Sequence, residues 1–422
     1  MHILLIHQAF AVIGEAGGTR HHEFARHMQA RGHQVSVIAG QLSYLTGATA
    51  DARDGDASSV DDLGVEIIRC ASYGGWHTSF VLRVVNFVSF MWTSFWSALR
   101  IKQVDLVWGT TPPIFQALTA SWVARIKRVP FLLEVRDLWP YFAIEVGVLS
   151  NPILIGLSEW LERFLYRRAS VVIVNSPGFV DHVRTRGADL IYVVPNGADP
   201  DLISAEATKA GLRSNLGIDE DTFVVLYAGA HGMSNDLGVV LRAAESLPAE
   251  ADVAFVLMGA GKDKAELQSR AQAQGLKKVY FHPPVPKDEI AGYLVEGDAG
   301  LAVLKDIPAY SLTYPNKVFD YMAAGLPVLC MIDGVIRKVV EDAAAGVFVQ
   351  PGDPSALSEA VLDWSSKGAE LKAMGQRGRD FVKERFDRGM LADQMLELML
   401  STMDGLLGER PKDDDPHSEG AG

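Results

Sequence analysis

The sequence predicts an α/β protein in which two doubly wound parallel-sheet domains face each other across a cleft. The chain has 422 residues, which is too long for one ordinary hydrophobic core and favours two domains. Short apolar runs typical of buried parallel strands alternate with helical patterns over residues 1–200. The same alternation starts again after a Pro-Asn-Gly turn at residues 195–197.

The first half opens with a strand, a glycine loop, a helix and a second strand. Residues 3–7 are an apolar run and residues 14–19 are the loop. The helix that follows carries Phe24 and Met28 on its apolar side and ends at Gly32, before a strand at 34–40. This order predicts a right-handed βαβ unit. Further strands are predicted within residues 104–110, 129–137, 169–176 and 191–199.

The second half repeats the pattern with apolar strands predicted within residues 222–229, 252–261, 278–283, 299–304 and 327–332. Two Rossmann-like sheets of this kind bind ligands at the carboxyl ends of their strands, so the cleft is the expected site. We expect domains at 1–200 and 201–385 and a helix at 386–407 that packs back toward the first domain. Residues 408–422 have almost nothing apolar to bury, which predicts a disordered tail.

Composition narrows the classes of function. Hydrophobic residues make up 48% of the chain, and the net charge of −13 argues against a general nucleic-acid binder. Cys70 and Cys330 lie in apolar surroundings that favour buried thiols in a reducing compartment, and no Cys/His cluster has metal-site spacing. The start, MHILLIHQAF, lacks the basic segment and cleavage site of a signal peptide, so we expect a cytoplasmic protein.

One apolar segment, residues 79–99, breaks the α/β pattern and leaves three interpretations open. It is either a buried helix, a helix that lies on a membrane surface or grips a lipid tail, or a membrane span; Arg83 and Asn86 argue against the span. A stripe of small polar residues follows helical spacing: Asn86, Ser89, Thr93 and Ser97. The candidates for membrane contact are aromatic: Phe90, Trp92, Phe95 and Trp96.

Two segments of the first half carry residues suited to anionic ligands. Gly17 and Gly18 allow close backbone approach ahead of a helix N-terminus, and Arg20 could add a charge-assisted contact to a phosphate. A plain strand-to-helix turn is the alternative. Farther along, an apolar strand runs into Glu134, Arg136 and Asp137 at its carboxyl end, which predicts either a functional cluster or a salt bridge.

The second half repeats the theme of a glycine after a strand. Gly229 precedes His231 within one turn, and Gly259, Gly261 and Lys262 follow the next strand. His231 is a candidate donor ligand or a plain turn residue.

The segment 314–329 carries the most specific pattern. Pro315 and Asn316 suit the start of a helix that places Lys317 in its first turn and Asp320 one turn on. Free amides plus a cation suit phosphate, and a carboxylate suits the hydroxyls of a ribose, so the pattern predicts a nucleotide site. The alternative is an intrahelical Lys317–Asp320 ion pair.

In this order, the segments GGTRHHEFARHMQARGHQVSVI, TTPPIFQAL, EVRDLWPY, LERFLYRRAS, VVPNGAD, YAGAHG and YPNKVFDYMAAGLPVL resemble the glycosyltransferases of family 4, whose architecture is called GT-B. The resemblance covers residues 1–400. Its nearest branch comprises bacterial transferases that build O-antigen, capsule or exopolysaccharide from nucleotide-linked amino or deoxy sugars.

The resemblance implies retaining sugar transfer that requires no metal ion or cofactor, with a UDP-sugar as the expected donor. The C-terminal domain would hold the donor and the N-terminal domain a glycan or undecaprenyl-linked acceptor, at the inner face of the cell membrane. Asp320 takes the place of the acid that binds the ribose. Lys317 and the amides of residues 314–317, Tyr314 included, would face the diphosphate, with Gly17 and Gly18 on the opposite side. Arg136 lies near the transferred sugar; with Lys317 and Asp137 it completes the expected catalytic set.

Departures from the family pattern leave other functions open. Leu312 and Asp320 stand where the family signature has two glutamates, and Ala230 and Asn235 stand where many members carry an Arg and a Lys. A nucleotide-sugar 2-epimerase or hydrolase of the same fold, with Asp137 and Glu134 as its candidate acid/base carboxylates, is one alternative. A non-catalytic binding subunit of a polysaccharide assembly complex is the other.

Overall fold

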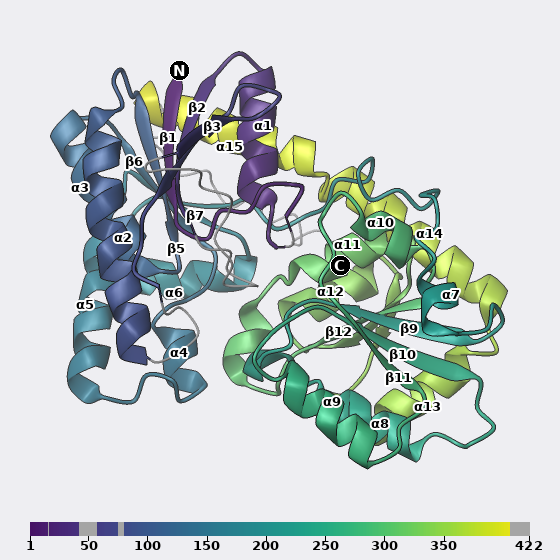
Figure 1. Ribbon diagram of the computed structural model, residues 1–422. Coiled ribbons are helices and arrows are strands. Elements are labelled where there is room, and N and C mark those ends of the chain that lie inside the picture. Colours follow the sequence, from purple (N-terminus) through teal and green to yellow (C-terminus); the bar gives the residue numbers. More distant parts are fainter. Residues whose placement is uncertain (16, 42–56, 75–79, 406–422) are drawn as a thin grey trace, which may run out of the picture.

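The computed structural model describes residues 1–15, 17–41, 57–74 and 80–405, and these form two α/β domains that lie side by side (Figure 1). The predicted fold class is therefore confirmed. The predicted tail at 408–422, the last residues of the helix predicted at 386–407, and the start of the segment at 79–99 lie outside the described residues.

The N-terminal domain contains an eight-stranded sheet in the order β3-β4-β2-β1-β5-β6-β7-β8. Every neighbouring pair is parallel except β3 and β4, which are antiparallel. The strands are β1 (His2–His7), β2 (Gln34–Gly40), β3 (Ala57–Val60), β4 (Glu66–Cys70), β5 (Leu106–Thr111), β6 (Phe131–Val135), β7 (Val171–Val174) and β8 (Ile191–Val193).

Helices cover both faces of this sheet because its strands are apolar on both sides. Leu4 and Ile6 of β1 pack under α2, α3 and α5, whereas Ile3 and Leu5 pack under α1 and α15. The helices of this domain are α1 (Arg20–Ala30), α2 (Phe80–Arg100), α3 (Ile114–Lys127), α4 (Tyr141–Glu145), α5 (Pro152–Arg168), η1 (Pro177–Phe179) and α6 (Val180–Thr185).

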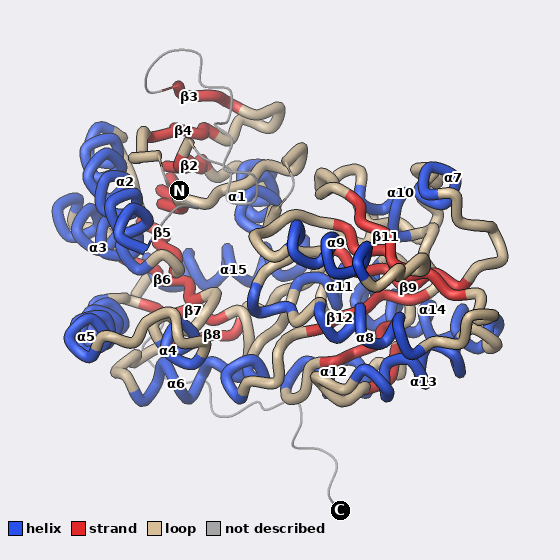
Figure 2. Tube along the Cα trace, turned by 60° about the horizontal axis from the view of Figure 1, so that its bottom comes forward, coloured by secondary structure: helices blue, strands red, loops and turns tan. Residues whose placement is uncertain are grey.

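The C-terminal domain contains a fully parallel six-stranded sheet in the order β11-β10-β9-β12-β13-β14. The strands are β9 (Phe223–Ala228), β10 (Val253–Met258), β11 (Val279–His282), β12 (Ala299–Val303), β13 (Val328–Met331) and β14 (Gly346–Phe348). Figure 2 shows these strands enclosed by helices. The helices are α7 (Leu212–Leu216), η2 (Met233–Asn235), α8 (Gly238–Ser246), α9 (Lys264–Ala273), α10 (Ile290–Leu294), η3 (Pro308–Leu312), α11 (Asn316–Ala323), α12 (Val335–Asp342), α13 (Pro354–Trp364) and α14 (Gly368–Arg385).

The last described helix, α15 (Arg388–Met403), returns to the N-terminal domain (Figure 1). Asp387 caps its start by accepting a hydrogen bond from the backbone N–H of Met390. Its apolar side, with Leu391 and Met395 almost fully buried, packs in the same core as α1 and β1. The chain therefore crosses between the domains twice, at residues 196–200 and again before α15.

The apolar segment at 79–99 forms α2, which is buried on one side and exposed on the other. Asn86 is fully buried and donates a hydrogen bond to the Tyr73 carbonyl, so the small polar stripe faces the protein. Phe90 is also fully buried, and its proposed membrane contact was wrong because the helix turns it into the core. Trp92 and Trp96, by contrast, are 59% and 49% exposed. Within the described ranges, no helix is long and apolar enough to cross a membrane.

Candidate active site

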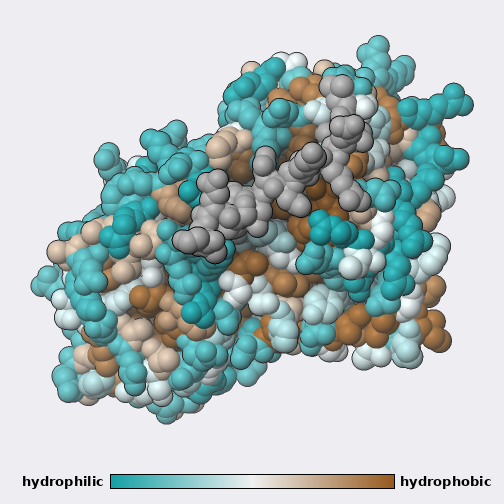
Figure 3. All heavy atoms as spheres, turned by 180° about the vertical axis from the view of Figure 1, so that it is seen from behind, coloured by the Kyte–Doolittle hydropathy of each residue, from teal (hydrophilic) through white to brown (hydrophobic). Residues whose placement is uncertain are grey.

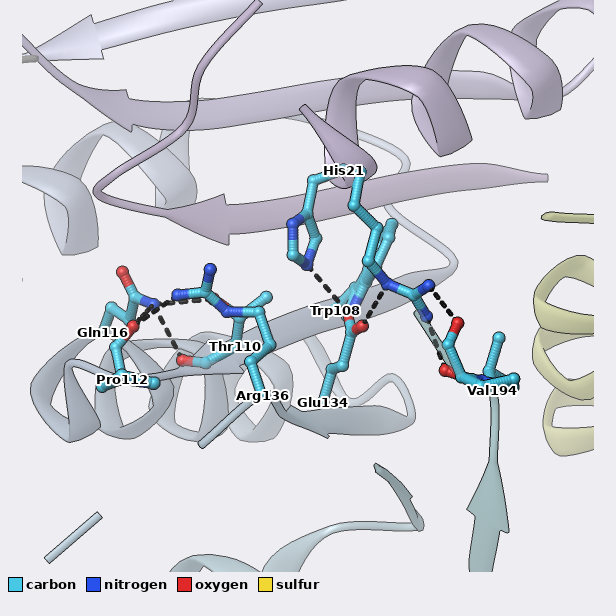
Figure 4. Close-up of polar contacts among 10 residues, drawn as sticks. His21, Trp108, Thr110, Pro112, Gln116, Glu134, Arg136 and Val194 are labelled. Carbon is cyan, nitrogen blue, oxygen red and sulfur yellow. Dashed lines mark hydrogen bonds and ion pairs between the residues drawn. The ribbon is translucent and has the colours of Figure 1, made fainter. Parts of the chain in front are cut away.

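The N-terminal side of the site is built around a buried carboxylate, Glu134, at the end of β6 (Figure 4). One oxygen accepts a hydrogen bond from Arg20 Nε at 3.0 Å, and the other lies 2.8 Å from His21 Nε2 and accepts from Trp108 Nε1 at 3.1 Å. Burial alone would raise the pKa of Glu134, but His21 and Arg20 outweigh it and hold that pKa well below the ordinary value. Glu134 is therefore an ionised structural anchor that holds α1 against the sheet.

This network occupies Arg20, which the sequence suggested as a phosphate ligand. Besides bonding Glu134, its guanidinium donates to the carbonyls of Pro195 and Val194 at 2.6 and 2.8 Å, and it stacks over the Phe24 ring. Arg20 is 4% exposed, and its guanidinium makes hydrogen bonds that join α1 to β6 and to the segment after β8. We therefore leave Arg20 out of the donor site.

Arg136 and Asp137 follow Glu134 and lie at the domain junction, which we define as the region where loops of the two domains meet. Arg136 Nη2 donates to the Pro112 carbonyl at 2.6 Å, which holds the guanidinium beside the β5–α3 loop. Asp137 stays in contact with solvent, but the protein crowded around its carboxyl desolvates it and raises its pKa to about 6. Both remain candidates for the chemistry that the sequence predicted.

On the C-terminal side, Lys317 lies in the first turn of α11 and points back to the end of β9. Its Nζ is 4.1 Å from the centroid of the Tyr227 ring and donates to Asn235 Oδ1 at 3.2 Å. A Cβ at Gly229 would lie 3.1 Å from this Nζ, so the glycine leaves room for the cation. Burial lowers the pKa of Lys317 to about 7. No carboxylate among the described residues pairs with it, so its charge responds to an anionic ligand.

Asp320, one turn farther along α11, pairs with a residue that the sequence did not suggest. Lys287 Nζ lies 2.6 Å from Asp320 Oδ1, and both side chains are largely buried. Within the described residues, no ion pair joins Lys317 to Asp320, so the intrahelical-pair alternative was wrong. The position of Lys287, in the loop that follows the carboxyl end of β11 at His282, was the signal that could have identified it.

His231, a predicted donor ligand, is fully buried instead of facing the junction. Its ring lies between those of Tyr227 and Phe281, and burial, with Lys264 and Lys317 nearby, lowers its pKa to about 4. Its backbone N–H donates to the Ala260 carbonyl at 2.8 Å. This placement matches the turn-residue alternative, and the ring supports the loop that follows Gly229.

The start of α11 meets the N-terminal domain. Asn196 Nδ2 donates to the Tyr314 carbonyl at 2.7 Å, and Pro315 occupies the N-cap. Asn316 Oδ1 is buried and has no hydrogen-bond partner among the described residues. The first turn leaves backbone N–H groups without helical acceptors, so residues 314–317 still suit an anion as predicted.

A second contact across the junction involves Leu312, at one of the places where the family signature has a glutamate. Its carbonyl accepts a hydrogen bond from Ser176 Oγ at 2.5 Å, and its side chain packs against the N-terminal core. A Cβ at Gly178 would lie 2.6 Å from the same carbonyl oxygen, so only glycine fits there. Leu312 therefore holds the two domains together and supplies no carboxylate.

The glycine loop ahead of α1 is exposed at Gly17 and Gly18. Gly17 has φ of 151°, which favours glycine, and a Cβ at Gly18 would meet no atom within 4 Å. The loop is free to contact a ligand. Among the described residues, no group of three or more His, Cys, Asp or Glu side chains could hold a metal ion.

Comparison with known families matches both halves of the chain. Residues 16–197 match the family described as "Glycosyl transferase 4-like domain", and residues 209–381 match "Glycosyl transferases group 1". The chain belongs to the family 4 glycosyltransferases. Its two sheets have the GT-B arrangement seen in solved members of this family.

Individual relatives are distant. A D-inositol 3-phosphate glycosyltransferase of Xylanimonas cellulosilytica is 31% identical over 209 residues, covering 47% of this chain and 48% of the relative, so the match spans about half of that protein. "Putative colanic acid biosynthesis glycosyl transferase WcaI" of Escherichia coli is 24% identical over 72% of this chain and 76% of its own. The Anabaena protein HepE, solved in complex with UDP and glucose, superposes with a TM-score of 0.72 at 17% identity, over 95% of this chain and all (100%) of the other, which shows the shared fold.

Proposed function

We propose that this protein is a retaining glycosyltransferase that moves a sugar, an amino or deoxy hexose, from a UDP-linked donor to a glycan or lipid-linked glycan in surface polysaccharide biosynthesis. The observation that carries the proposal is the arrangement at α11. Lys317 is half-buried beside the backbone amides of the first helical turn, and Asp320 follows one turn later. In the part of the chain that the structure describes, no carboxylate pairs with Lys317.

This arrangement suits a nucleoside diphosphate. The α11 amides and Lys317 would bind the two phosphates, and Asp320 would accept hydrogen bonds from the ribose hydroxyls after Lys287 yields one oxygen. In solved HepE the bound nucleotide is UDP, which supports UDP as the carrier. The WcaI relative bears a name that refers to colanic acid, which supports a role in surface polysaccharide.

The chemical demand on the site is to stabilise charge on the leaving diphosphate. The bond between the anomeric carbon and the β-phosphate oxygen breaks, and a bond from the acceptor oxygen forms on the same face. The departing phosphate oxygen takes the acceptor proton, so no protein nucleophile is needed. Lys317 on one side and Arg136 on the other would stabilise the negative charge as it develops.

The alternative of an epimerase or hydrolase rests on carboxylates near the sugar. Glu134 does not serve, because it is buried and bonded to Arg20 and His21. Asp137 remains, since its pKa of about 6 lets it exchange protons near neutral pH.

The experiment that tests the proposal measures nucleoside diphosphate release from a panel of UDP-, GDP- and dTDP-sugars, with and without an undecaprenyl-diphosphate-linked acceptor. We expect release from a UDP-sugar only when acceptor is present, and loss of release in Lys317→Ala. Release or isomerisation without acceptor would assign the protein to the hydrolase or epimerase class. Nucleotide binding without any turnover would assign it to a binding subunit.

If the acceptor is lipid-linked, the sugar transfer takes place at the inner face of the cell membrane. The N-terminal domain, as the acceptor-binding half, would then approach the lipid, and the exposed side of α2 belongs to that domain.

A further inference from the structure

The outer surface of the N-terminal domain exposes large apolar side chains on three adjacent helices. α3 packs against both α2 and α5, and all three cover the same face of the sheet. Viewed from behind, brown spheres gather at the outer edge of this domain, at the right of Figure 3. The exposed apolar side chains of this surface include Trp92, Trp96, Trp122, Ile126, Leu157 and Trp160.

Aromatic rings connect these helices into one surface. The Trp92 and Trp96 rings of α2 lie 5.9 Å apart edge to face, and the Phe95 ring lies 6.3 Å from the Trp122 ring of α3. Trp160, 61% exposed on α5, stacks on Phe164 with ring centroids 5.6 Å apart. These rings are ordered by one another while their outer faces remain in water, which costs free energy unless a partner covers them.

The same surface is basic, although the whole chain has a net charge of −13. The helices α2 and α3 contain no acidic residue, and one of the two acids of α5, Glu162, is buried and paired with His182 and Arg186. The other acid of α5, Glu159, pairs with Arg163 at 3.5 Å. The exposed cations of these helices and of the residue after α3 are Arg83, Arg100, Arg125, Arg128, Arg163, Arg167 and Arg168. Acidic charge is therefore concentrated elsewhere on the molecule.

Cations and aromatic rings meet in two surface hollows. One, between α2 and the end of α3, is lined by Phe95, Trp122, Arg125, Ile126 and Arg128. The other, on α5, is lined by Trp160, Arg163, Phe164, Arg167 and Arg168. Indole rings and guanidinium groups are the side chains that suit the headgroup region of a bilayer, where an apolar body and a phosphate lie within a few ångströms of each other.

We propose that this surface, which we name the Trp–Arg face, docks the protein on an anionic lipid bilayer. The Trp–Arg face consists of the exposed Trp, Ile, Leu and Arg side chains of α2, α3 and α5 that are named above, together with Arg128, which follows α3. The tryptophans insert among the headgroups and the arginines pair with lipid phosphates. The sequence left membrane contact by the segment at 79–99 as one of three interpretations; the folded arrangement adds two more helices and a local positive charge.

Docking through this face deepens the proposed function and rests on it in one respect, which is the lipid-linked acceptor. The helices α2, α3 and α5 each begin on the side of the sheet where strands end, and that side meets the C-terminal domain. Most of the Trp–Arg face, Trp96 and Trp122 included, lies in the later turns of these helices, so a bilayer under it would contact the acceptor domain on its outer side, away from the junction.

The test is co-sedimentation of the full-length protein with vesicles, without donor or acceptor. Vesicles made of equal parts phosphatidylglycerol and phosphatidylcholine are compared with vesicles of phosphatidylcholine alone. We expect the wild type to bind the anionic vesicles and to be released as salt is added. Arg125→Glu with Arg168→Glu should weaken this binding by at least about tenfold, since each basic side chain at such a surface contributes about 1 kcal/mol.

Two further variants make the result specific. Trp92→Ser with Trp96→Ser should also weaken binding, whereas Lys383→Glu with Arg385→Glu, exposed residues of α14 in the other domain, should bind as the wild type does. All variants should keep the wild-type thermal midpoint and wild-type turnover on a soluble, short-chain acceptor. Equal binding to neutral and anionic vesicles, or wild-type binding by the Arg125→Glu, Arg168→Glu variant, would overturn the proposal. Vesicle binding is measured without substrates, so a protein that does not bind vesicles can still be a transferase. A protein without transferase activity can likewise still bind vesicles.

Discussion

Lys317 is the residue on which the proposed chemistry depends most, because it is half-buried and residues 1–15, 17–41, 57–74 and 80–405 supply no carboxylate partner for it. Its contacts, the face of Tyr227 and the amide oxygen of Asn235, are neutral and do not compensate the cost of burying a cation. Its pKa of about 7 means that the free enzyme holds this residue partly uncharged at neutral pH. A diphosphate would restore the charge and would bind more tightly to the protonated form.

This pKa predicts how activity depends on pH. In the free enzyme, kcat/KM for the donor should fall as the pH rises through about 7, because Lys317 loses its proton. The donor's phosphates raise the pKa in the complex, so the fall in kcat should come at a higher pH. Lys317→Arg should be less active at its optimum but should not show the fall near pH 7, since arginine stays charged. An alkaline limb at the same pH in Lys317→Arg and wild type would show that another group is responsible.

At the scale of single residues, the sequence identified the positions but only some of the partners. Lys317 and Asp320 lie where the helix pattern predicted, because a helix start is a local property of Pro315 and its neighbours. Lys287, far along the chain from Asp320, could not be paired with it without the fold. The burial of Arg20 and His231 could not be predicted for the same reason: a glycine-rich turn predicts a loop, but burial depends on distant segments such as residues 194–195 and Gly261.

Among the elements, α2 shows most clearly what periodicity can and cannot predict. Its length and helical character follow from an uninterrupted apolar run. Which side of α2 faces the core does not follow from the sequence pattern, because aromatic residues occur all around the helix. The buried polar stripe decided the matter: Asn86 bonds Gln8 and Tyr73, so the side that looked more polar faces inward, and Trp92 faces out.

The orientation of α2 predicts a difference in stability between two aromatic substitutions. Phe90→Ala should lower the free energy of unfolding by about 3–5 kcal/mol, because it leaves a cavity in the core under α2. Trp92→Ala, at a side chain that is 59% exposed, should change it by less than about 1 kcal/mol. Urea unfolding followed by circular dichroism measures both. Comparable losses for the two variants would mean that α2 is oriented differently.

The strands likewise fall into those that the sequence predicted and those that it did not. The apolar strands that became β5, β6, β7, β9 and β10 were predicted from their composition. The edge strand β3 and its neighbour β4 were not predicted, because β4, which carries Glu66 and Arg69, has a mixed polar sequence that does not indicate a strand until its partner β2 is known.

For the molecule as a whole, the sequence predicted two domains but not how they meet. The junction depends on contacts between residues more than 100 positions apart, Ser176 with Leu312 and Asn196 with Tyr314. Both link a loop after an N-terminal strand to the segment between β12 and α11, so the carboxyl ends of the two sheets face one site. Because Leu312 and Tyr314 lie just before the start of α11, movement of one domain against the other would displace Lys317 and Asp320.

The central claim is that the C-terminal side of this junction binds the nucleotide of a sugar donor, with Asp320 on the ribose. Calorimetric titration of UDP into the wild type, Asp320→Asn and Asp333→Asn tests it most directly. Asp333 is an exposed acid of the same domain, paired with Arg337 on the surface, and serves as the matched control.

Wild type and Asp333→Asn should bind UDP with the same affinity. Asp320→Asn should bind roughly tenfold or more weakly, because a hydrogen bond to a charged group is worth about 1.5–3 kcal/mol. If Asp320→Asn binds UDP as tightly as the wild type does, with its fold intact, the nucleotide is not where α11 places it and the account is contradicted.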